Sequence, residues 1–339
     1  MATAVSNQPS VNIYACGGGG INVTAELESH RGATTPGFAQ FNSYYIDTSR
    51  SNLSYKSIQP DCIYLFESVD GSGKKRRENA ELISKNTRAI LQCFKPSAFN
   101  IVIHTASGGS GSVIGPALVS ELKARGERVI VIVIGSTDTR IEIENTIKTR
   151  KSYEAIAQLR QSPVIVHYAE NSRLKSRFIV NKEVKYAVSL LLGLFSGQNE
   201  ELDSADLTSW MEFLPFTGGH PQLSALNFVL SLDDVKSVGN ATSVATLALP
   251  DMDTRLGDAI PAYQCVGYAP LRWRVGTPES AQMIKDTPLH YVISADYSVR
   301  TDAALATALR EADAAMASQN PRESLLRSTD TATENGLVL

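Results

Sequence analysis

A run of six small residues between two apolar patterns constrains this chain more than any other feature. An apolar run at residues 99–104 predicts a buried strand, and the pattern from Val113 onward predicts a helix. The loop between them consists of Ser107, Gly108, Gly109, Ser110, Gly111 and Ser112. Glycine has no Cβ and accepts positive φ, so this backbone can fold closely around a ligand. Its N–H groups, the serine hydroxyls and the positive end of the following helix together predict a cradle for phosphate oxygens.

A second glycine-rich turn follows a short apolar strand expected at residues 11–15, and a helix is expected to follow it at residues 21–29. The dinucleotide-binding fingerprint requires a third glycine three residues after a Gly-x-Gly pair, but Asn22 and Val23 stand at those positions. No glycine-rich turn in the chain ends in Gly-Lys-Ser or Gly-Lys-Thr, which excludes a Walker phosphate loop. The glycines of this turn are Gly17, Gly18, Gly19 and Gly20.

Strands and helices alternate through the first half of the chain. Strands separated by helices of this length predict an α/β fold, with a parallel sheet covered on both faces. Further strands are expected at residues 44–46, 61–66, 128–134 and 164–168, and helices at 79–94, 113–125 and 141–159. Ligands bind such sheets at the carboxyl ends of the strands. The loops expected at that edge are the two glycine turns, Asp47, residues 71–73, residues 135–139 and Asn171.

In the second half of the chain, strands and helices alternate less regularly. A long helix is expected at residues 177–195, followed by a polar segment at 198–207. Strands less tightly interleaved with helices then predict a second, α+β domain; they are expected at residues 223–230, 263–268 and 289–297. We divide the chain into a nucleotide-binding domain (1–176), a central helix (177–197), the second domain with the polar segment (198–300), and a C-terminal helix with a tail (301–339).

The last part of the chain predicts an alanine-rich amphipathic helix at residues 301–316. Leu305, Leu309 and Met316 are expected to face inward, with the helix packed on the outside of the second domain. The polar stretch after it begins at the helix-breaking pair Asn320 and Pro321, and is expected to form a flexible tail.

Composition excludes several classes of protein. The chain is 43% hydrophobic and 20% charged, with a formal net charge of -3, which is typical of a soluble globular protein with no global basic surface for nucleic acid or an anionic membrane. The four cysteines show no CxxC pair and the five histidines no HExxH spacing, so neither a zinc site nor a disulfide framework is indicated. No leader segment or membrane-spanning run is recognised, and a cytoplasmic protein is expected.

Two polar features allow more than one interpretation. The consecutive cations Lys74, Lys75, Arg76 and Arg77 either face a triphosphate or form a solvated surface. Asp203 and Asp206 lie three residues apart at the expected start of a short helix, where an N-cap and a first-turn acid are both common.

These motifs resemble the tubulin and FtsZ superfamily of polymerising GTPases, and within it the phage tubulins of the PhuZ type. The six-residue loop with Val113 is similar to the family signature Gly-Gly-Gly-Thr-Gly-Ser-Gly, and departs from it at the first, fourth and last positions. The resemblance covers nearly the whole chain and implies that it binds GTP and GDP. The further nucleotide contacts it implies are the first glycine turn with Asn22, then Asp47 with Thr48, a γ-phosphate-sensing loop of Gly71, Ser72 and Gly73, the ribose-side pair Glu144 and Lys148, and the guanine contacts Asn171 and Asn181.

The segment at residues 201–207 is similar to the Asn-Leu-Asp-Phe-Ala-Asp-Val segment of FtsZ, with Glu201 in place of the asparagine. The resemblance implies that Asp203 and Asp206 enter the nucleotide site of the next subunit in a head-to-tail filament and orient the attacking water. An N-cap role for Asp203 is compatible with this chemistry. Magnesium held mainly by phosphates and water would leave little signature in the protein.

The resemblance further implies a self-associating protein whose C-terminal tail contacts the next subunit, and a phage-encoded filament that positions phage DNA in the bacterial cytoplasm. Two alternatives remain open. A nucleotide-dependent enzyme on a doubly wound fold, such as a dehydrogenase, would share the glycine turns, although the missing third glycine speaks against it. The other is a GTP-binding module that does not polymerise.

Overall fold

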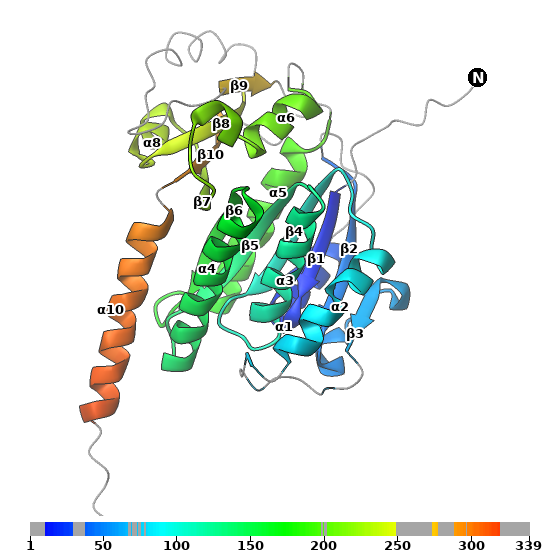
Figure 1. Ribbon diagram of the computed structural model, residues 1–339, viewed down its shortest axis with the longest axis vertical. Helices are drawn as coiled ribbons and strands as arrows, with labels where there is room; N and C mark the ends of the chain where they lie inside the picture. The colour runs from blue at the N-terminus through cyan, green and yellow to red at the C-terminus, as the bar shows by residue number, and fades with distance from the viewer. Residues whose placement is uncertain are drawn as a thin grey trace, which may run out of the picture.

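The computed structural model describes residues 11–29, 38–66, 69, 73, 76–77, 79–197, 199, 202–248, 273–276, 288–295 and 297–318. These residues form one ten-stranded sheet with the order β3-β2-β1-β4-β5-β6-β7-β10-β8-β9 (Figure 1). The strands are β1 (Val11–Cys16), β2 (Phe41–Asp47), β3 (Ile63–Leu65), β4 (Phe99–Thr105), β5 (Val129–Ser136), β6 (Val164–Asn171), β7 (Leu223–Val229), β8 (Ala241–Leu247), β9 (Trp273–Gly276) and β10 (Leu289–Ser294). All pairs from β3 to β7 are parallel, and β10 is antiparallel to β7 and β8. The expected α/β fold is confirmed.

Helices cover both faces of the parallel part of the sheet. One face packs against α1 (Gly17–Ser29) and α5 (Arg177–Leu194). The other packs against α2 (Ala80–Cys93), α3 (Gly111–Ala124) and α4 (Arg140–Arg160). The remaining helices are η1 (Arg50–Leu53), η2 (Pro60–Cys62), α6 (Ser204–Met211), α7 (Leu214–Thr217), α8 (Leu232–Ser237) and α10 (Tyr297–Ser318). Among the residues that the structure describes, no helix combines the length and apolarity that a membrane crossing requires.

Strand β5 explains why both faces must be covered. Its isoleucines belong to the core under α1 and α5, whereas its valines belong to the core under α2, α3 and α4. Every residue of the strand is buried. Alternate side chains of a strand point to opposite faces, so a run of β-branched residues without polar alternation fits only a strand buried on both sides.

The strands of the second half extend the first sheet. β6 pairs with β7 in parallel over Val164–Val166 and Leu223–Ala225, which joins the two halves. β8, β9 and α8 were not among the expected elements, and β10 ends at Ser294, before the expected end of that strand at residue 297. The strand expected at residues 263–268 lies outside the described residues, and the domain boundaries stay predictions.

The C-terminal helix α10 contacts β7, but its ion pairs join it to α4 of the nucleotide-binding half. Arg140 Nε lies 2.5 Å from Asp313 Oδ1, and Arg150 Nε lies 2.7 Å from Asp302 Oδ1. The expectation that α10 packs on the outside of the second domain is therefore corrected. Leu305 is fully buried and Leu309 half-buried, as the pattern predicts, but Met316 is 60% exposed and its expected inward orientation is wrong.

Candidate functional site

The two glycine-rich turns touch each other. α1 begins at Gly17 and α3 at Gly111, so each turn runs directly into a helix. Gly17 has a φ of +71°, and a Cβ placed on it would lie 2.6 Å from the backbone nitrogen of Gly111. A Cβ on Gly111 would lie 2.6 Å from the carbonyl oxygen of Cys16. Neither position has room for a side chain, and the close approach brings the first-turn N–H groups of two helices to one place.

A cavity of about 270 Å³ opens beside these turns, at the carboxyl edge of β4, β5 and β6. Its position at this edge is the one expected for a parallel sheet. It is lined by Gly18, Gly19, Asn22, Thr105, Ser107, Gly108, Ile134, Ser136, Glu142, Asn171, Arg177 and Asn181. The structure thus brings seven of the sequence-predicted residues together: Gly18, Gly19, Asn22, Ser107, Gly108, Asn171 and Asn181.

The other predicted residues of the two turns lie behind this lining. Ser110 contacts Thr48, and the Ser112 hydroxyl donates to the carbonyl oxygen of Gly109 over 3.0 Å, which braces the loop from inside. Gly17, Gly20, Gly109 and Gly111 complete the same two turns without lining the cavity. Gly71 and Ser72 lie outside the described residues, and Gly73 is exposed, with nothing within 4 Å of the position that its Cβ would take.

Asp47 is buried beneath the loop that follows β2. It is 1% exposed; its Oδ1 accepts from the backbone N–H of Thr48 and its Oδ2 from Asn52 Nδ2, each over 2.7 Å. Burial raises the pKa of the Asp47 carboxyl, and the hydrogen bonds from Asn52 and Thr48 oppose that shift. Asp47 does not line the cavity. Its bonds hold the adjacent loop in place.

Asn171 lines the cavity and carries a buried side-chain acceptor. Its side chain is 8% exposed, and its Oδ1 is buried without a hydrogen-bond partner among the described residues. A buried polar atom left unpaired costs about 1–3 kcal/mol. A ligand N–H at this position would recover that cost. Asn181, one helix turn inside α5, lines the same cavity.

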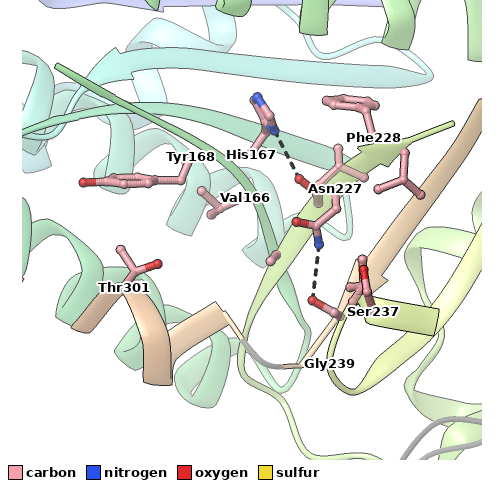
Figure 2. Close-up of a pocket in the computed structure, with 13 residues that line it drawn as sticks. Val166, His167, Tyr168, Asn227, Phe228, Ser237, Gly239 and Thr301 are labelled. Carbon is pink, nitrogen blue, oxygen red and sulfur yellow. Dashed lines mark hydrogen bonds between the residues drawn. The ribbon is translucent and has the colours of Figure 1, made fainter. Parts of the chain in front are cut away.

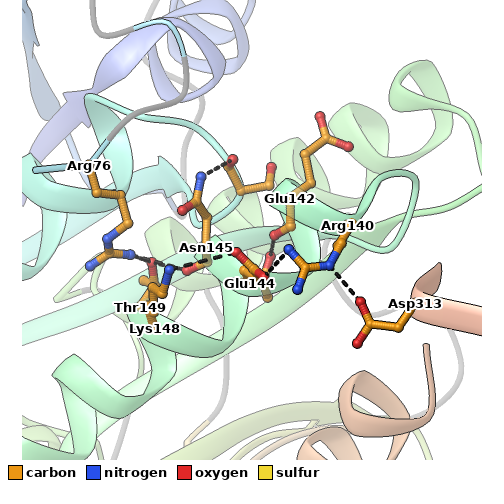
Figure 3. Close-up of polar contacts among 10 residues, drawn as sticks. Arg76, Arg140, Glu142, Glu144, Asn145, Lys148, Thr149 and Asp313 are labelled. Carbon is orange, nitrogen blue, oxygen red and sulfur yellow. Dashed lines mark hydrogen bonds and ion pairs between the residues drawn. The ribbon is translucent and has the colours of Figure 1, made fainter. Parts of the chain in front are cut away.

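The expected ribose-side pair is not brought into the cavity. Lys148 Nζ lies 3.8 Å from Glu144 Oε2, and Arg140 Nη1 lies 2.6 Å from Glu144 Oε1 (Figure 3). The residue of α4 that lines the cavity is Glu142, which is 4% exposed and accepts from the Ser136 hydroxyl over 3.0 Å. An acid and a base four residues apart are typical of a solvent-facing helix surface, which is the signal that separates Glu144 from Glu142.

The two described members of the cation run, Arg76 and Arg77, are not among the residues that line the cavity. Lys74 and Lys75 lie outside the described residues, and Arg77 is exposed. Arg76 is half-buried and reaches α4. A cation that does line the cavity is Arg177, the first residue of α5, which no sequence motif indicates.

Asp203 caps α6, as the capping interpretation predicts. Its Oδ1 accepts from the backbone N–H groups of Ala205 and Asp206, both over 2.8 Å. Neither acid lines the cavity. α5 has 18 residues and is therefore about 27 Å long; Arg177 at its start lines the cavity, whereas α6 follows its far end (Figure 1). Within one subunit the acids and the cavity lie at opposite ends of α5.

A second cavity, of about 490 Å³, lies where β6 and β7 separate (Figure 2). His167 Nδ1 lies 3.1 Å from the carbonyl oxygen of Leu226, and Asn227 Nδ2 lies 3.4 Å from Ser294 Oγ. The first contact joins β6 to β7, and the second joins β7 to its paired neighbour β10. The lining includes no glycine-rich helix start, so the cavity beside the two glycine turns remains the candidate site for phosphates.

The side chains near the cavity indicate how a magnesium ion could be held there. Within the described ranges, no group of three or more histidine, cysteine, aspartate or glutamate residues is placed to hold a metal ion. Hydroxyls, phosphates and water are ordinary ligands of Mg²⁺, so the serine-rich cradle is compatible with an ion bound chiefly through a nucleotide.

Fold and cavity together define a nucleotide-binding α/β protein, with phosphate cradles at two helix starts. The sequence profile of the Tubulin/FtsZ family GTPase domain matches residues 10–177, which carry both cradles and the cavity lining up to Arg177. This chain belongs to the tubulin/FtsZ family, and that segment is its GTPase domain.

Similarity to known phage proteins extends beyond that domain. The chain is 29% identical over 338 residues to a phage tubulin-like protein of Pseudomonas phage phiKZ, with 96% of this chain and 97% of the relative covered. It is 28% identical over 331 residues to a phage tubulin-like protein of Pseudomonas phage PhiPA3, with 96% and 98% covered. A solved protofilament of TubZ from bacteriophage PhiKZ is similar with a TM-score of 0.80 and 28% identity, over 97% of this chain and 99% of that one.

Proposed function

We propose that this chain is a phage tubulin, which binds GTP, polymerises head to tail and hydrolyses GTP at the contact between subunits. The observation that carries the proposal is the separation of Asp203 and Asp206 from the nucleotide cavity of their own subunit. The similarity to a solved protofilament over 97% of this chain supports it, because a stacked neighbour can supply acids that the subunit's own cavity lacks.

Each part of the cavity suits one part of GTP. The N–H groups at the starts of α1 and α3, with Ser107 and Gly108, bind phosphate oxygens. The unpaired Oδ1 of Asn171 accepts from the guanine N–H groups, and Asn181 contacts the same base. Glu142, which lines the cavity, accepts from the ribose hydroxyls in place of the expected pair of Glu144 and Lys148.

Magnesium bound with the nucleotide supplies positive charge that balances the phosphate oxygens. The side chains of this protein perform the remaining work. The cradle holds the terminal phosphate in position, and carboxylates from the next subunit orient the attacking water. Asp203 is exposed at the start of α6 and Asp206 is half-buried one turn later, so both project from a helix end that a neighbour can approach.

A contact between the cavity end of one subunit and the α6 end of the next is heterologous and does not close on itself. Repeated contacts of this kind produce a filament. Hydrolysis removes the γ-phosphate from the contact and weakens it, which makes the filament dynamic. We further propose that the tail at residues 319–339 contacts the next subunit, so that deleting residues 320–339 raises the concentration needed for assembly.

The cellular role follows from the relationship to phage tubulins. We propose that the filament positions phage DNA within the cytoplasm of a bacterial host, without binding nucleic acid directly and without a membrane partner. The formal net charge of -3 supports the absence of direct nucleic-acid binding, because that contact depends on a cationic surface.

Sedimentation and right-angle light scattering with GTP, GDP and NAD test the proposal. We expect assembly with GTP, little with GDP and none with NAD. A dehydrogenase would respond to NAD, and a GTP-binding module that does not polymerise would bind GTP without scattering. Absence of GTP-dependent assembly at every protein concentration would contradict the proposal.

A further inference from the structure

Arg76 reaches from the segment between β3 and α2 onto the inner side of α4. Its Nη1 donates to the backbone carbonyl oxygen of Asn145 over 3.1 Å and also to Thr149 Oγ1 (Figure 3). Asn145 and Thr149 are both buried, at 4% and 0% exposure. The guanidinium thus bonds to two residues on successive turns of one helix, within a largely desolvated region.

The same two residues of α4 hold the start of the phosphate cradle. Asn145 Nδ2 donates to the carbonyl oxygen of Ser107 over 3.2 Å. Thr149 Oγ1 lies 3.2 Å from the carbonyl oxygen of Ala106 and 2.8 Å from that of Asn145. Both contacts run from α4 to the residues where the cradle begins.

Arg76 influences which carbonyl oxygen accepts the hydrogen bond from the Thr149 hydroxyl. A hydroxyl has one proton, and Thr149 Oγ1 has two carbonyl oxygens within reach. The Asn145 carbonyl already accepts a bond from Arg76, in addition to the backbone bond of the helix. Arg76 therefore competes with the Thr149 hydroxyl for the Asn145 carbonyl oxygen, which favours the bond from the hydroxyl to Ala106, although the Asn145 oxygen is the nearer of the two. Arg76 also donates to Thr149 Oγ1 itself, which fixes the orientation of the hydroxyl.

Holding these carbonyls determines where the N–H groups of the cradle point. In a planar trans peptide unit the C=O and the following N–H point in opposite directions. The Ser107 carbonyl is directed to Asn145, so the N–H of Gly108 is turned to the opposite side. Gly108 lines the cavity. The contact with α4 therefore orients a backbone donor for an anion.

We propose that Arg76 is a positioning residue of the phosphate cradle, acting through Asn145 and Thr149 of α4 on the peptide units at Ala106 and Ser107. The inference rests on the proposed nucleotide site, since it concerns the phosphate-binding half of that site. It gives one member of the Lys74–Arg77 cation run a role in phosphate binding without direct contact with phosphate.

The neighbouring arginine provides a matched control. Arg77 has the same charge and is exposed, so Arg76→Ala and Arg77→Ala change the net charge of the chain equally. Binding of GDP and of guanosine is measured by calorimetry for each variant, below the protein concentration at which assembly begins. GDP contacts the cradle through its phosphates, whereas guanosine has none.

Arg76→Ala is expected to weaken GDP binding roughly tenfold and to leave guanosine binding within about twofold of wild type. Arg77→Ala is expected to leave both within about twofold. Arg76→Lys, which keeps one donor group but not the planar fork, should recover part of the GDP affinity. A purely structural role for Arg76 would lower both affinities together, and that result, or equal behaviour of Arg76→Ala and Arg77→Ala, would overturn the proposal.

Thr149→Val provides a second test through the other end of the contact. It removes the hydroxyl with little change in shape and should produce the same selective loss of GDP binding. The double variant with Arg76→Ala should lose no more than the larger single loss, because both act through one path. Additive losses would contradict the proposed path. If wild-type protein bound guanosine but not GDP, the nucleotide site itself would be wrong, and that failure differs from failure of the Arg76 variants alone.

Discussion

The hydroxyl oxygens of Thr48 and Ser110 lie 2.5 Å apart and join two loops that are 62 residues apart in the chain. Thr48 follows the buried carboxylate of Asp47, and Ser110 precedes the first residue of α3. The loop after β2 is thereby tied to the phosphate cradle. The arrangement of one loop depends on the other.

Thr48→Val removes this bond while preserving the shape of the side chain. We expect GDP binding to weaken about fivefold, since a hydrogen bond of this kind contributes about 1 kcal/mol. Ser51→Ala is the matched control, because its hydroxyl contacts Ser49 over 2.9 Å at an exposed position away from the cradle. Equal GDP affinity for Thr48→Val and wild type, measured by calorimetry, would show that the tie between the loops has no effect on binding.

Asn171→Ala removes the unpaired acceptor at the cavity. The ratio of GDP to ADP affinity should fall about tenfold, because a buried contact to the guanine N–H groups is lost. Asn199→Ala is the control: its Oδ1 is also buried without a described partner, but its Nδ2 donates to Gly193 and Leu194 carbonyls at the far end of α5. That variant should lower thermal stability without changing the ratio. An unchanged ratio for Asn171→Ala would remove this residue from base recognition.

Asp203 has a capping role that must be separated from its proposed chemistry. Asp203→Ala should abolish GTP turnover, leave persistent filaments and cost about 1 kcal/mol of stability through loss of the cap. Asp203→Ser keeps a side-chain oxygen for the Ala205 and Asp206 N–H groups, so it should also abolish turnover but retain most of the stability. GTPase assays and denaturant unfolding distinguish the two effects. Wild-type turnover in the serine variant would mean that the carboxylate has no role in hydrolysis.

Two buried histidines predict a pH dependence of stability. Burial lowers the pKa of His104 and of His290 to about 4. An unfolded histidine titrates near 6.5, so below that pH the unfolded chain binds more protons than the folded one. Stability is therefore retained above pH 6.5 and is lost as the pH falls toward 4, with a slope approaching about 1.4 kcal/mol per pH unit for each histidine.

Unfolding by urea between pH 7 and 5.5 measures this slope in wild type and in two variants. His290→Asn keeps a polar partner for Thr246, which lies 2.7 Å from His290 Nδ1, and should reduce the slope. His220→Asn, at an exposed position, is the control. A slope that is the same in wild type and His290→Asn would contradict the assignment to this histidine.

The sequence predicts the nucleotide-binding half well because its signals are local. The apolar runs that become β4, β5 and β6 can be satisfied only in a sheet covered on both faces, and glycine turns that run into helices occur where such strands end. The resemblance to a known family adds the identity of the nucleotide. Together they locate Gly18, Asn171 and Asn181 at one cavity before any coordinates are known.

Other features depend on contacts that no local pattern contains. Choosing between Glu142 and Glu144 requires the rotation of α4 on the sheet: Glu142 lines the cavity, whereas Glu144 pairs with Lys148 on the surface of the helix. The position of α10 depends on ion pairs between residues about 150 or more positions apart, such as Arg150 and Asp302. The extension of the sheet through β7 depends on three residue pairs between β6 and β7, which join two halves of the chain whose strands and helices alternate differently.

The central claim is that a complete active site requires two subunits, and the dependence of GTP turnover on protein concentration tests it most directly. Turnover per subunit is measured together with light scattering across the range in which assembly begins. The account predicts that turnover per subunit is low below the assembly threshold and rises with scattering above it. Turnover per subunit that is constant from far below the threshold to far above it would contradict the claim.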